Sequence, residues 1–180
     1  MDLNTDNVNL LNTQTFNFSI NMCPKLTEYV QSVSIPGVTL GEVGAETPFV
    51  RIPEPGDKLT YSVLGVSFLV DEELKNWLEI FDWMTSLGFP DNFQQYGNIP
   101  AAKRLSGGQT RDDMVLIIYN NQSTPILKVI FKDAFPIAVG DIPLTASDTT
   151  SEAPVATADF MYRTSVSYTH LRAHETSYDR

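Results

Sequence analysis

The sequence is poor in the residues that most often carry out chemistry. Its 180 residues include one cysteine, Cys23, and two histidines, His170 and His174. A single cysteine excludes an internal disulfide, which fits a reducing compartment. No apolar run approaches the roughly 20 residues that a membrane-spanning helix needs. The polar N-terminus has neither the basic nor the apolar region of a signal peptide, so we expect no membrane anchor.

Basic residues are also scarce. The chain has 12 Lys and Arg against 22 Asp and Glu, a formal net charge of −10, and Lys103-Arg104 is its adjacent basic pair. Proteins that grip nucleic acid usually carry a clustered basic patch. The charge balance therefore argues against DNA binding, although an acidic surface would let DNA pass without adhering to it.

The two histidines do not form a metal or catalytic site on the sequence pattern. His170 and His174 are four residues apart and Glu175 follows, which on a helix would supply half of a zinc site. No third ligand stands at a suitable spacing, and both histidines lie in a tail without regular periodicity. Without them no histidine remains for a triad or a general base. We expect no catalytic residue, no metal, no cofactor and no enzymatic activity.

Three other groups have simpler structural explanations. Asp71, Glu72 and Glu73 suit the start of a helix, where carboxylates accept from free N–H groups and favour the dipole, better than a cation site. Gly107-Gly108 lacks the Lys-Ser/Thr of a phosphate-binding loop. Cys23, beside Pro24, could be a reactive thiol or a half-buried structural residue, and the absence of a sequence-adjacent cationic partner favours the second.

The composition is that of a folded protein. Apolar residues make up 42% and aromatic residues 11% of the chain, enough for one domain with a core. We predict a polar N-terminal arm over 1–14, one domain over 15–163 and a tail over 164–180. The end of that tail, SYTHLRAHETSYDR, resembles the translation of a sequencing adapter, so we expect it to be disordered or non-native and without function.

The clearest local pattern is Leu59–Leu87, a strand that leads into an amphipathic helix. The inward set changes from Leu59, Tyr61 and Val63 to Leu64, Val66, Phe68 and Val70, which predicts a β-bulge or bend near Gly65. The helix is predicted from an N-cap at Asp71 to Gly88. Its predicted buried stripe is Leu74, Trp77, Leu78, Phe81, Met84 and Leu87. Trp83 lies off this stripe, either at the core rim or at a subunit contact.

The other elements are predicted as strands and loops. The expected strands are Thr15–Ile20, Tyr29–Ile35, Met114–Tyr119 buried on both faces, Ile126–Phe131, a short edge strand Ile142–Leu144, and Val155–Tyr162. Pro36-Gly37 predicts a turn, and Asn120-Asn121 suits a hairpin turn. Val38–Asp57, with a short strand over Phe49–Ile52, is either a surface loop or a segment that reaches a neighbouring molecule. Phe89–Asp113 is predicted to be irregular and mobile, and Phe135-Pro136 to begin a non-regular connection.

The order of several short motifs resembles that of a known family. These are Pro24-Lys25-Leu26, Ile35-Pro36-Gly37, Pro55-Gly56-Asp57, Val70-Asp71-Glu72 before Asn76-Trp77, and Phe131-Lys132-Asp133-Ala134-Phe135-Pro136. Over Thr15–Tyr162 the chain resembles the tail tube protein family of contractile-tailed bacteriophages. Related baseplate proteins that initiate the tube share this fold.

The resemblance implies a mainly β protein with one flanking α-helix (α+β), a small antiparallel β-barrel or sandwich of the phage tail tube type. It implies a structural subunit that assembles as stacked, hexameric rings whose inner strands join into one sheet around a DNA conduit. Implied partners are other copies of the chain, tail sheath and baseplate proteins, with DNA passing through unbound. The implied location is the virion tail, assembled in the host cytoplasm.

Two other function classes stay open beside the tube subunit. The chain could be a baseplate tube initiator or another accessory virion module that binds a partner through the Val38–Asp57 and Phe89–Asp113 loops. An enzyme has little support, because no set of nucleophile, base and orienting group stands out.

Overall fold

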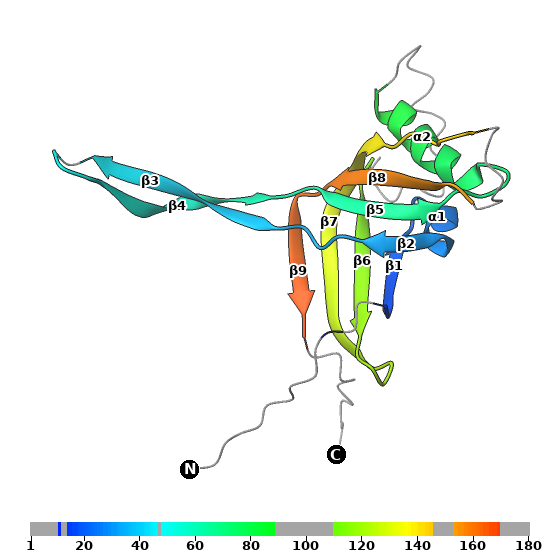
Figure 1. Ribbon diagram of the computed structural model, residues 1–180, viewed down its shortest axis with the longest axis horizontal. Helices are drawn as coiled ribbons and strands as arrows, with labels where there is room; N and C mark the ends of the chain where they lie inside the picture. Colours follow the sequence, from blue (N-terminus) through cyan, green and yellow to red (C-terminus); the bar gives the residue numbers. More distant parts are fainter. Residues whose placement is uncertain (1–10, 12–13, 47, 89–109, 146–152, 170–180) are drawn as a thin grey trace, which may run out of the picture.

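The computed structural model describes residues 11, 14–46, 48–88, 110–145 and 153–169, which form a β body with one long projecting hairpin (Figure 1). The elements, in chain order, are β1 Phe16–Ile20, α1 Pro24–Glu28, β2 Val30–Val33, β3 Val38–Glu46, β4 Arg51–Tyr61, β5 Leu64–Leu69, α2 Lys75–Gly88, β6 Asp112–Tyr119, β7 Pro125–Val139, β8 Val155–Met161 and β9 Thr164–Tyr168.

The body is one antiparallel sheet folded over on itself. Its strand order is β1-β6-β7-β8-β5-β2, and β9 pairs with the first part of β7. β7 changes partners along its length: Pro125–Ala134 pairs with β6, and Phe135–Val139 pairs with β8. Asp133, which has a φ of 53°, lies at this change. The result is two layers: the β6 layer (β1, β6, the first part of β7, and β9) and the β5 layer (β2, β5, β8 and the end of β7), whose strands run across one another in Figure 1.

Alternate side chains of both layers fill a single core. In β6, Met114, Leu116 and Ile118 are buried, whereas Val115 and Ile117 on the other face are half-buried. The predicted burial of this strand on both faces is therefore only half right, since one face has no covering layer among the described residues. The buried residues of the two layers belong to one cluster: Phe18, Ile20, Met114, Leu116, Ile118, Val129 and Phe131 from one, and Leu64, Val66, Phe68, Ala156, Ala158 and Phe160 from the other.

The expected barrel does not close. β1 and β2 stand at the two ends of the strand order and are not paired with each other. The mainly β, antiparallel character is confirmed, but a second, short helix, α1, was not predicted. It joins β1 to β2 and carries Leu26, whose side chain is fully buried. Pro24 at the first turn explains why a helix can begin here, since proline is tolerated where no N–H partner is needed.

Helix α2 packs on the body with a different face from the predicted one. Its buried residues are Asn76, Ile80, Trp83 and Ser86, whereas Leu74, Leu78 and Phe81 are 41%, 43% and 42% exposed. The prediction that centred the buried stripe on Leu78 and Phe81 is wrong, and so is the rim or subunit-contact position for Trp83, which is 4% exposed and lies beside Phe160. Trp77, Met84 and Leu87 are half-buried against the core.

The predicted N-cap is also wrong. Helix α2 begins at Lys75, after a turn in which Leu74 N donates to Asp71 O and Leu74 adopts a φ of 58°. Asn76 organises this entry: its Nδ2 donates to Leu69 O at 2.6 Å, and its Oδ1 accepts from Asp71 N and Trp77 N. The fully buried amide therefore connects the end of β5 to the first turn of the helix. Gly88, predicted as the C′ residue just beyond the helix, is the last residue of α2.

The predicted strand Leu59–Val70 is two strands in different environments. β4 ends at Tyr61 in the projecting hairpin, β5 begins at Leu64 in the body, and Ser62 and Val63 lie between them. Gly65 lies inside β5, opposite Asp159, so the bulge predicted there is wrong. The slip in the pattern is real, but it marks the exit of the chain from the hairpin, where Leu59 is 57% exposed, into the core, where Leu64 is fully buried.

The remaining sequence predictions have mixed outcomes. The first strand and the β6–β7 hairpin are confirmed, with Asn120 Oδ1 accepting from Gln122 N and Thr124 N in the turn. β7 continues through Phe135-Pro136, which was expected to be irregular, and Asp112-Asp113 already belong to β6. The strand predicted at Ile142–Leu144 is absent from this described segment.

Three further corrections concern a turn, a strand and the C-terminal part of the described chain. No turn forms at Pro36-Gly37, because the chain continues extended from β2 into β3, with Ser34 N donating to Gly65 O and Ser62 N to Gly37 O. The predicted strand Tyr29–Ile35 is shortened to β2 by helix α1. Thr164–Tyr168, expected to belong to an irregular tail, forms β9 against Lys128–Lys132. Most of the segment 89–113 and residues 170–180 lie outside the described residues.

Candidate assembly surfaces

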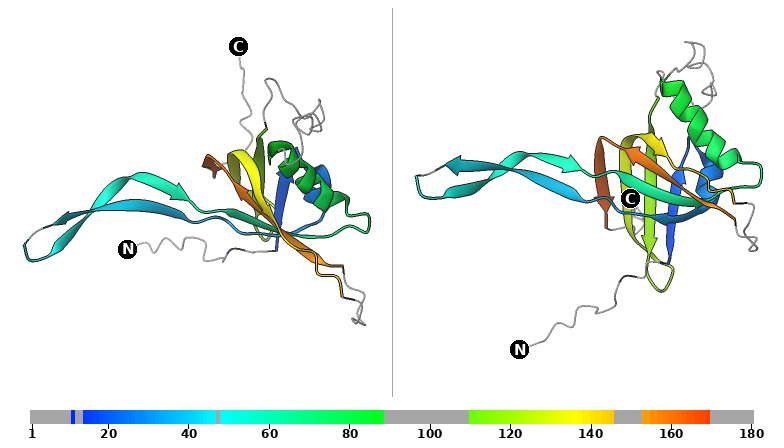
Figure 2. Two further views of the ribbon diagram at one scale, coloured as in Figure 1. Left: turned by 90° about the horizontal axis from the view of Figure 1, so that it is seen from above. Right: turned by 45° about the horizontal axis from the view of Figure 1, so that its top comes forward.

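The most unusual feature of the molecule is the hairpin of β3 and β4, which we call the arm (Val38–Tyr61). It projects far from the body in all three views (Figures 1 and 2). Its strands pair with each other as a separate two-stranded sheet. Of the two alternatives predicted for Val38–Asp57, the surface loop is wrong, because the segment is part of a regular two-stranded ribbon. That it reaches a neighbouring molecule stays a prediction.

The arm carries apolar side chains that the rest of the described chain leaves exposed. Leu40 pairs with Leu59 and Val38 with Tyr61, and because alternate strand residues share a face, these four lie on the same side of the ribbon. Leu40 and Leu59 are 51% and 57% exposed. An isolated two-stranded hairpin is at best marginally stable in water. We therefore expect another surface to cover the apolar face of the arm.

The outer end of the arm is apolar as well. Phe49 is 96% exposed, and Ile52, which pairs with Ala45, is 45% exposed. The nearby ion pair Arg51–Glu46 (3.8 Å) joins two solvent-exposed side chains and contributes little to stability. A phenylalanine ring held in water at the end of a long ribbon is typical of a contact residue, because aromatic anchors dominate protein interfaces.

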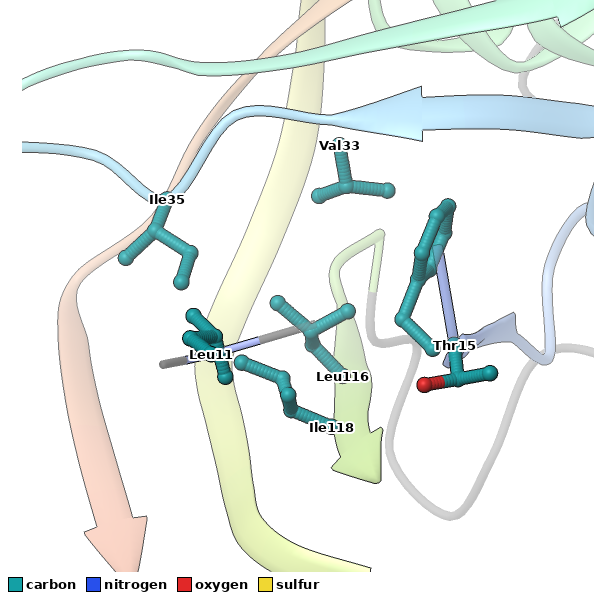
Figure 3. A pocket seen from close by; sticks show the side chains of 7 residues that line it. Leu11, Thr15, Val33, Ile35, Leu116 and Ile118 are labelled. Atoms are coloured by element: carbon teal, nitrogen blue, oxygen red, sulfur yellow. The ribbon is translucent and has the colours of Figure 1, made fainter. Parts of the chain in front are cut away.

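A second surface lies where the folded sheet remains open, between β1 and β2. We call it the seam groove. Its apolar part is a cavity of about 110 Å³ lined by Leu11, Thr15, Phe16, Val33, Ile35, Leu116 and Ile118. Figure 3 shows Val33 and Ile35 on one side of it and Leu116 and Ile118 on the other, with Leu11 near Ile35. A neighbouring, more polar hollow is lined by Gln14, Phe16, Asn17, Phe18, Thr27, Val30 and Gln31.

A third apolar surface is the outer side of helix α2. Leu74, Leu78 and Phe81 follow one another at helical spacing and each is more than two-fifths exposed. The ring of Trp77 stacks on Phe81 with centroids 5.2 Å apart, and its Nε1 donates to Gly140 O. Leu74, Leu78 and Phe81, which the sequence pattern assigned to the core of the domain, therefore lie on the surface.

The residues examined for chemistry do not assemble into a site. Glu73 forms an ion pair with Lys75, and Cys23 is buried. Among the described residues, no three His, Cys, Asp or Glu side chains gather as a metal site would require. Gly107-Gly108, His170, His174 and Glu175 lie outside the described residues. None of the described helices combines the length and apolar character needed to cross a membrane.

One ionisable group in the core is perturbed. The Tyr162 hydroxyl is buried and finds no hydrogen-bond partner among the described residues. Tyr162 packs against Phe131 and Tyr61, with ring centroids 5.0 Å and 5.5 Å away. Burial, and secondly the neighbouring Tyr61, raises the pKa of Tyr162 above its usual value of 10.0. The group is a structural feature of the core and lies beside Tyr61, where the arm joins the body.

Sequence reasoning missed the seam groove and the role of Phe49. The groove forms between strands that are adjacent in sequence but unpaired in space, so no local pattern reveals it. The arm did leave a signal, since Val38, Leu40 and Thr39 alternate and Leu59, Tyr61 and Thr60 mirror them across the ribbon. The prolines Pro53 and Pro55 obscured it, because proline in a strand usually argues against pairing on that edge.

Comparison with known proteins gives a consistent result. No protein-family model matches the chain. The chain is 29% identical, over 161 residues that span 86% of both proteins, to the tail tube terminator protein of Enterobacteria phage T4.

Solved structures share its fold. The chain superposes on a subunit of the sheath-tube complex of the extracellular contractile injection system PVC with a TM-score of 0.60, at 14% identity, covering 89% of this chain and 93% of the other. It also superposes on the tube-terminating cap of the anti-feeding prophage with a TM-score of 0.56, at 15% identity, covering 94% and 100%. The sequence similarity and the shared fold both support the resemblance of this chain to the tube proteins of contractile tails.

Proposed function

We propose that this chain is a ring-forming structural subunit that ends the tail tube of a contractile phage tail. The observation that carries the proposal is the similarity to a tail tube terminator, which spans 86% of both chains and so includes the arm as well as the body. The fold likeness to a tube-terminating cap, which covers the whole of that chain, supports the same role.

The arm supports assembly into an oligomer. It exposes Val38, Leu40, Phe49, Ile52 and Leu59 to solvent in a single copy. Exposed apolar surface of this extent on a projecting ribbon marks a protein contact. In a ring of identical subunits, each arm would be covered by an adjacent copy and each copy would present an arm in turn.

The remaining parts of the proposal follow from the family resemblance. Six copies would form the ring, DNA would pass through its centre without specific binding, and sheath and baseplate proteins of the tail would be its partners. The net charge of −10 agrees with a channel to which DNA does not adhere. The protein would act in the virion tail after assembly in the host cytoplasm.

A second candidate is the repeating tube subunit itself. It is favoured by the superposition on a subunit of a sheath-tube complex with a TM-score of 0.60. The two roles differ in one property. A repeating subunit binds another ring on both of its faces, whereas a terminator binds the tube on one face and leaves the other face closed to further rings.

Electron microscopy of the purified protein tests the proposal. We expect separate rings with a central opening that do not stack into long tubes, together with attachment of rings to one end of pre-formed tail tubes. Long tubes made of this protein alone would favour the role of repeating tube subunit over that of terminator. A protein that remains monomeric at high concentration, and attaches to no tube end, would refute both roles.

A further inference from the structure

The apolar cavity of the seam groove is small for a cofactor and large enough for a side chain. Its apolar cavity measures about 110 Å³, below the range of about 300–1,000 Å³ typical of sites for small molecules. Val33, Ile35, Leu116 and Ile118 line it, and Ile35 at its rim is 54% exposed. Such a hollow suits one large apolar side chain from a protein partner.

The groove also has room for an extended backbone. β1 pairs only with β6, and β2 only with β5, so that among the described strands each has a side without a strand partner. Unpaired strand edges invite an added extended segment. The amide side chains of Asn17 and Gln31, which line the polar hollow beside the cavity, supply further hydrogen-bonding groups for such a segment.

The same chain carries a segment with the matching properties. The arm is extended, it carries exposed apolar side chains such as Leu40 and Leu59, and Phe49 at its outer end is 96% exposed. An aromatic side chain buries about 150–250 Å² when it enters an interface. Phe49 is therefore the most exposed large apolar side chain of the described chain and the natural occupant of an apolar hollow.

The arm of a given molecule cannot enter its own groove. β2 continues directly into β3, which leads away from the body, and the views in Figures 1 and 2 agree that the tip lies at the far end of the molecule. Backbone hydrogen bonds join the segment Ser34–Gly37 to Ser62 and to Gly65 of β5, which fixes the direction of departure. The occupant must be the arm of another copy.

We propose that Phe49, at the end of the arm of one copy, inserts into the seam groove of the next copy, between Ile35 and Ile118. The donor and acceptor surfaces differ, so the contact is heterologous and propagates from copy to copy until a ring closes. This inference rests on the proposed ring function and specifies the contact that builds the ring.

Two substitutions separate the donor from the acceptor. Phe49→Ala removes the inserted ring, and Ile35→Arg places a charge at the groove rim. Matched controls are Leu144→Ala, which truncates an apolar residue that is 86% exposed outside the arm, and Ile137→Arg, which charges a 42% exposed position on β7. We expect each interface variant to require at least tenfold more protein than the wild type for assembly, whereas both controls assemble normally.

Mixing the two interface variants gives the sharpest test. The Phe49→Ala copy retains a working groove, and the Ile35→Arg copy retains a working arm. Their mixture should form dimers that grow no further, because a single productive contact remains. Mass photometry distinguishes monomer, dimer and ring. The inference is wrong if Phe49→Ala assembles normally. It is also wrong if the mixed variants form no dimer although their melting temperatures match that of the wild type. Neither result would contradict ring formation by the wild type.

A crosslink tests the contact without requiring rings. A Phe49→Cys copy mixed with an Ile35→Cys copy under mild oxidation should yield a disulfide-linked heterodimer, whereas Phe49→Cys with Ile137→Cys should not. If the wild type fails to form rings, the proposed function fails, and the crosslink still decides whether the arm enters the groove. Absence of the specific crosslink at high protein concentration would refute the contact.

Discussion

Gly56 crosses the backbone of Gly41 so closely that a Cβ on Gly56 would stand 2.5 Å from Gly41 O and 2.7 Å from Gly41 C. The two residues lie where the pairing of β3 and β4 shifts register, between Leu40 and Glu42. Only a residue without a side chain fits at this point. The close approach sets the path of the arm beyond its midpoint and thus the position of its tip.

Replacement of Gly56 by alanine should distort the arm while leaving the body folded. The added Cβ meets backbone atoms, which cannot rotate away, and overpacking of this kind costs about 1–3 kcal/mol. We expect faster amide exchange over β3 and β4, weaker ring assembly and an unchanged melting temperature of the body. Gly44→Ala is the matched control, because a Cβ there meets only the exposed, flexible side chain of Arg51. Equal behaviour of the two variants would contradict this account.

Truncation of Trp83 should destabilise the whole domain. Its ring is 4% exposed, and its Nε1 donates to Thr110 O at 3.0 Å. Trp83→Ala should lower the free energy of unfolding by about 3–5 kcal/mol, because removal of a large buried ring leaves a cavity. Leu78→Ala, on the exposed side of the same helix, should change it by about 0.5 kcal/mol or less. Chemical denaturation measures both. A larger loss of stability in Leu78→Ala than in Trp83→Ala would instead support the buried stripe that the sequence pattern indicated.

Substitution of Asn76 tests the junction between β5 and α2. In Asn76→Asp, the donor that bonds Leu69 O at 2.6 Å is replaced by an acceptor oxygen, although the bonds from Asp71 N and Trp77 N can remain. A buried carbonyl left without a partner costs about 1–3 kcal/mol, and a buried charge adds to this. Denaturation at neutral pH should show a loss of at least that size. The exposed Asn17→Asp on β1 serves as the control and should be nearly neutral.

The buried hydroxyl of Tyr162 predicts a weakness at alkaline pH. Burial raises its pKa in the folded state above the unfolded value of 10.0, so the folded protein binds this proton more tightly. The associated stability is fully present below pH 10.0 and is lost as the pH rises through the folded-state pKa. Tyr162→Phe should remove this loss. It should leave stability at neutral pH unchanged or slightly higher, since it deletes a polar group without a partner among the described residues.

Thermal melting of both proteins across pH 7 to 11 measures the difference. The wild type should lose stability above pH 10 more steeply than the Phe variant. A parallel decline of the two would show that other groups govern the alkaline transition. Tyr168→Phe, at a position 46% exposed on β9, is the control for a tyrosine in contact with solvent.

Strand alternation and turn chemistry were sufficient to predict part of the fold. The pattern Phe16, Phe18, Ile20 marks a strand with one buried face, and the structure buries Phe18 and Ile20 in β1. The turn at Asn120 follows from an amide that can accept from nearby backbone N–H groups. These features are local, since they depend on residues within a few positions of one another, and the sequence of that segment is enough to specify them.

Helix α2 shows where local pattern is ambiguous. Its apolar residues surround most of the helix, so two different stripes have helical spacing. The position of Phe160 and the hydrogen bond from Asn76 to Leu69 O select the stripe with Ile80 and Trp83. The choice depends on which surface the neighbouring strands present, and this is a property of the packed domain.

By itself, the sequence determined a mainly β chain with one principal helix, an acidic charge balance and the resemblance to tail tube proteins. Only the tertiary structure decided that Val38–Tyr61 leaves the body as an arm, that β1 and β2 do not pair with each other, and that Phe49 is exposed at the arm's end. The physical reason is that edges, grooves and projecting ribbons are defined by what fails to pack against them. Which surfaces stay uncovered depends on the pairing of all the strands, and a local sequence pattern does not contain this information.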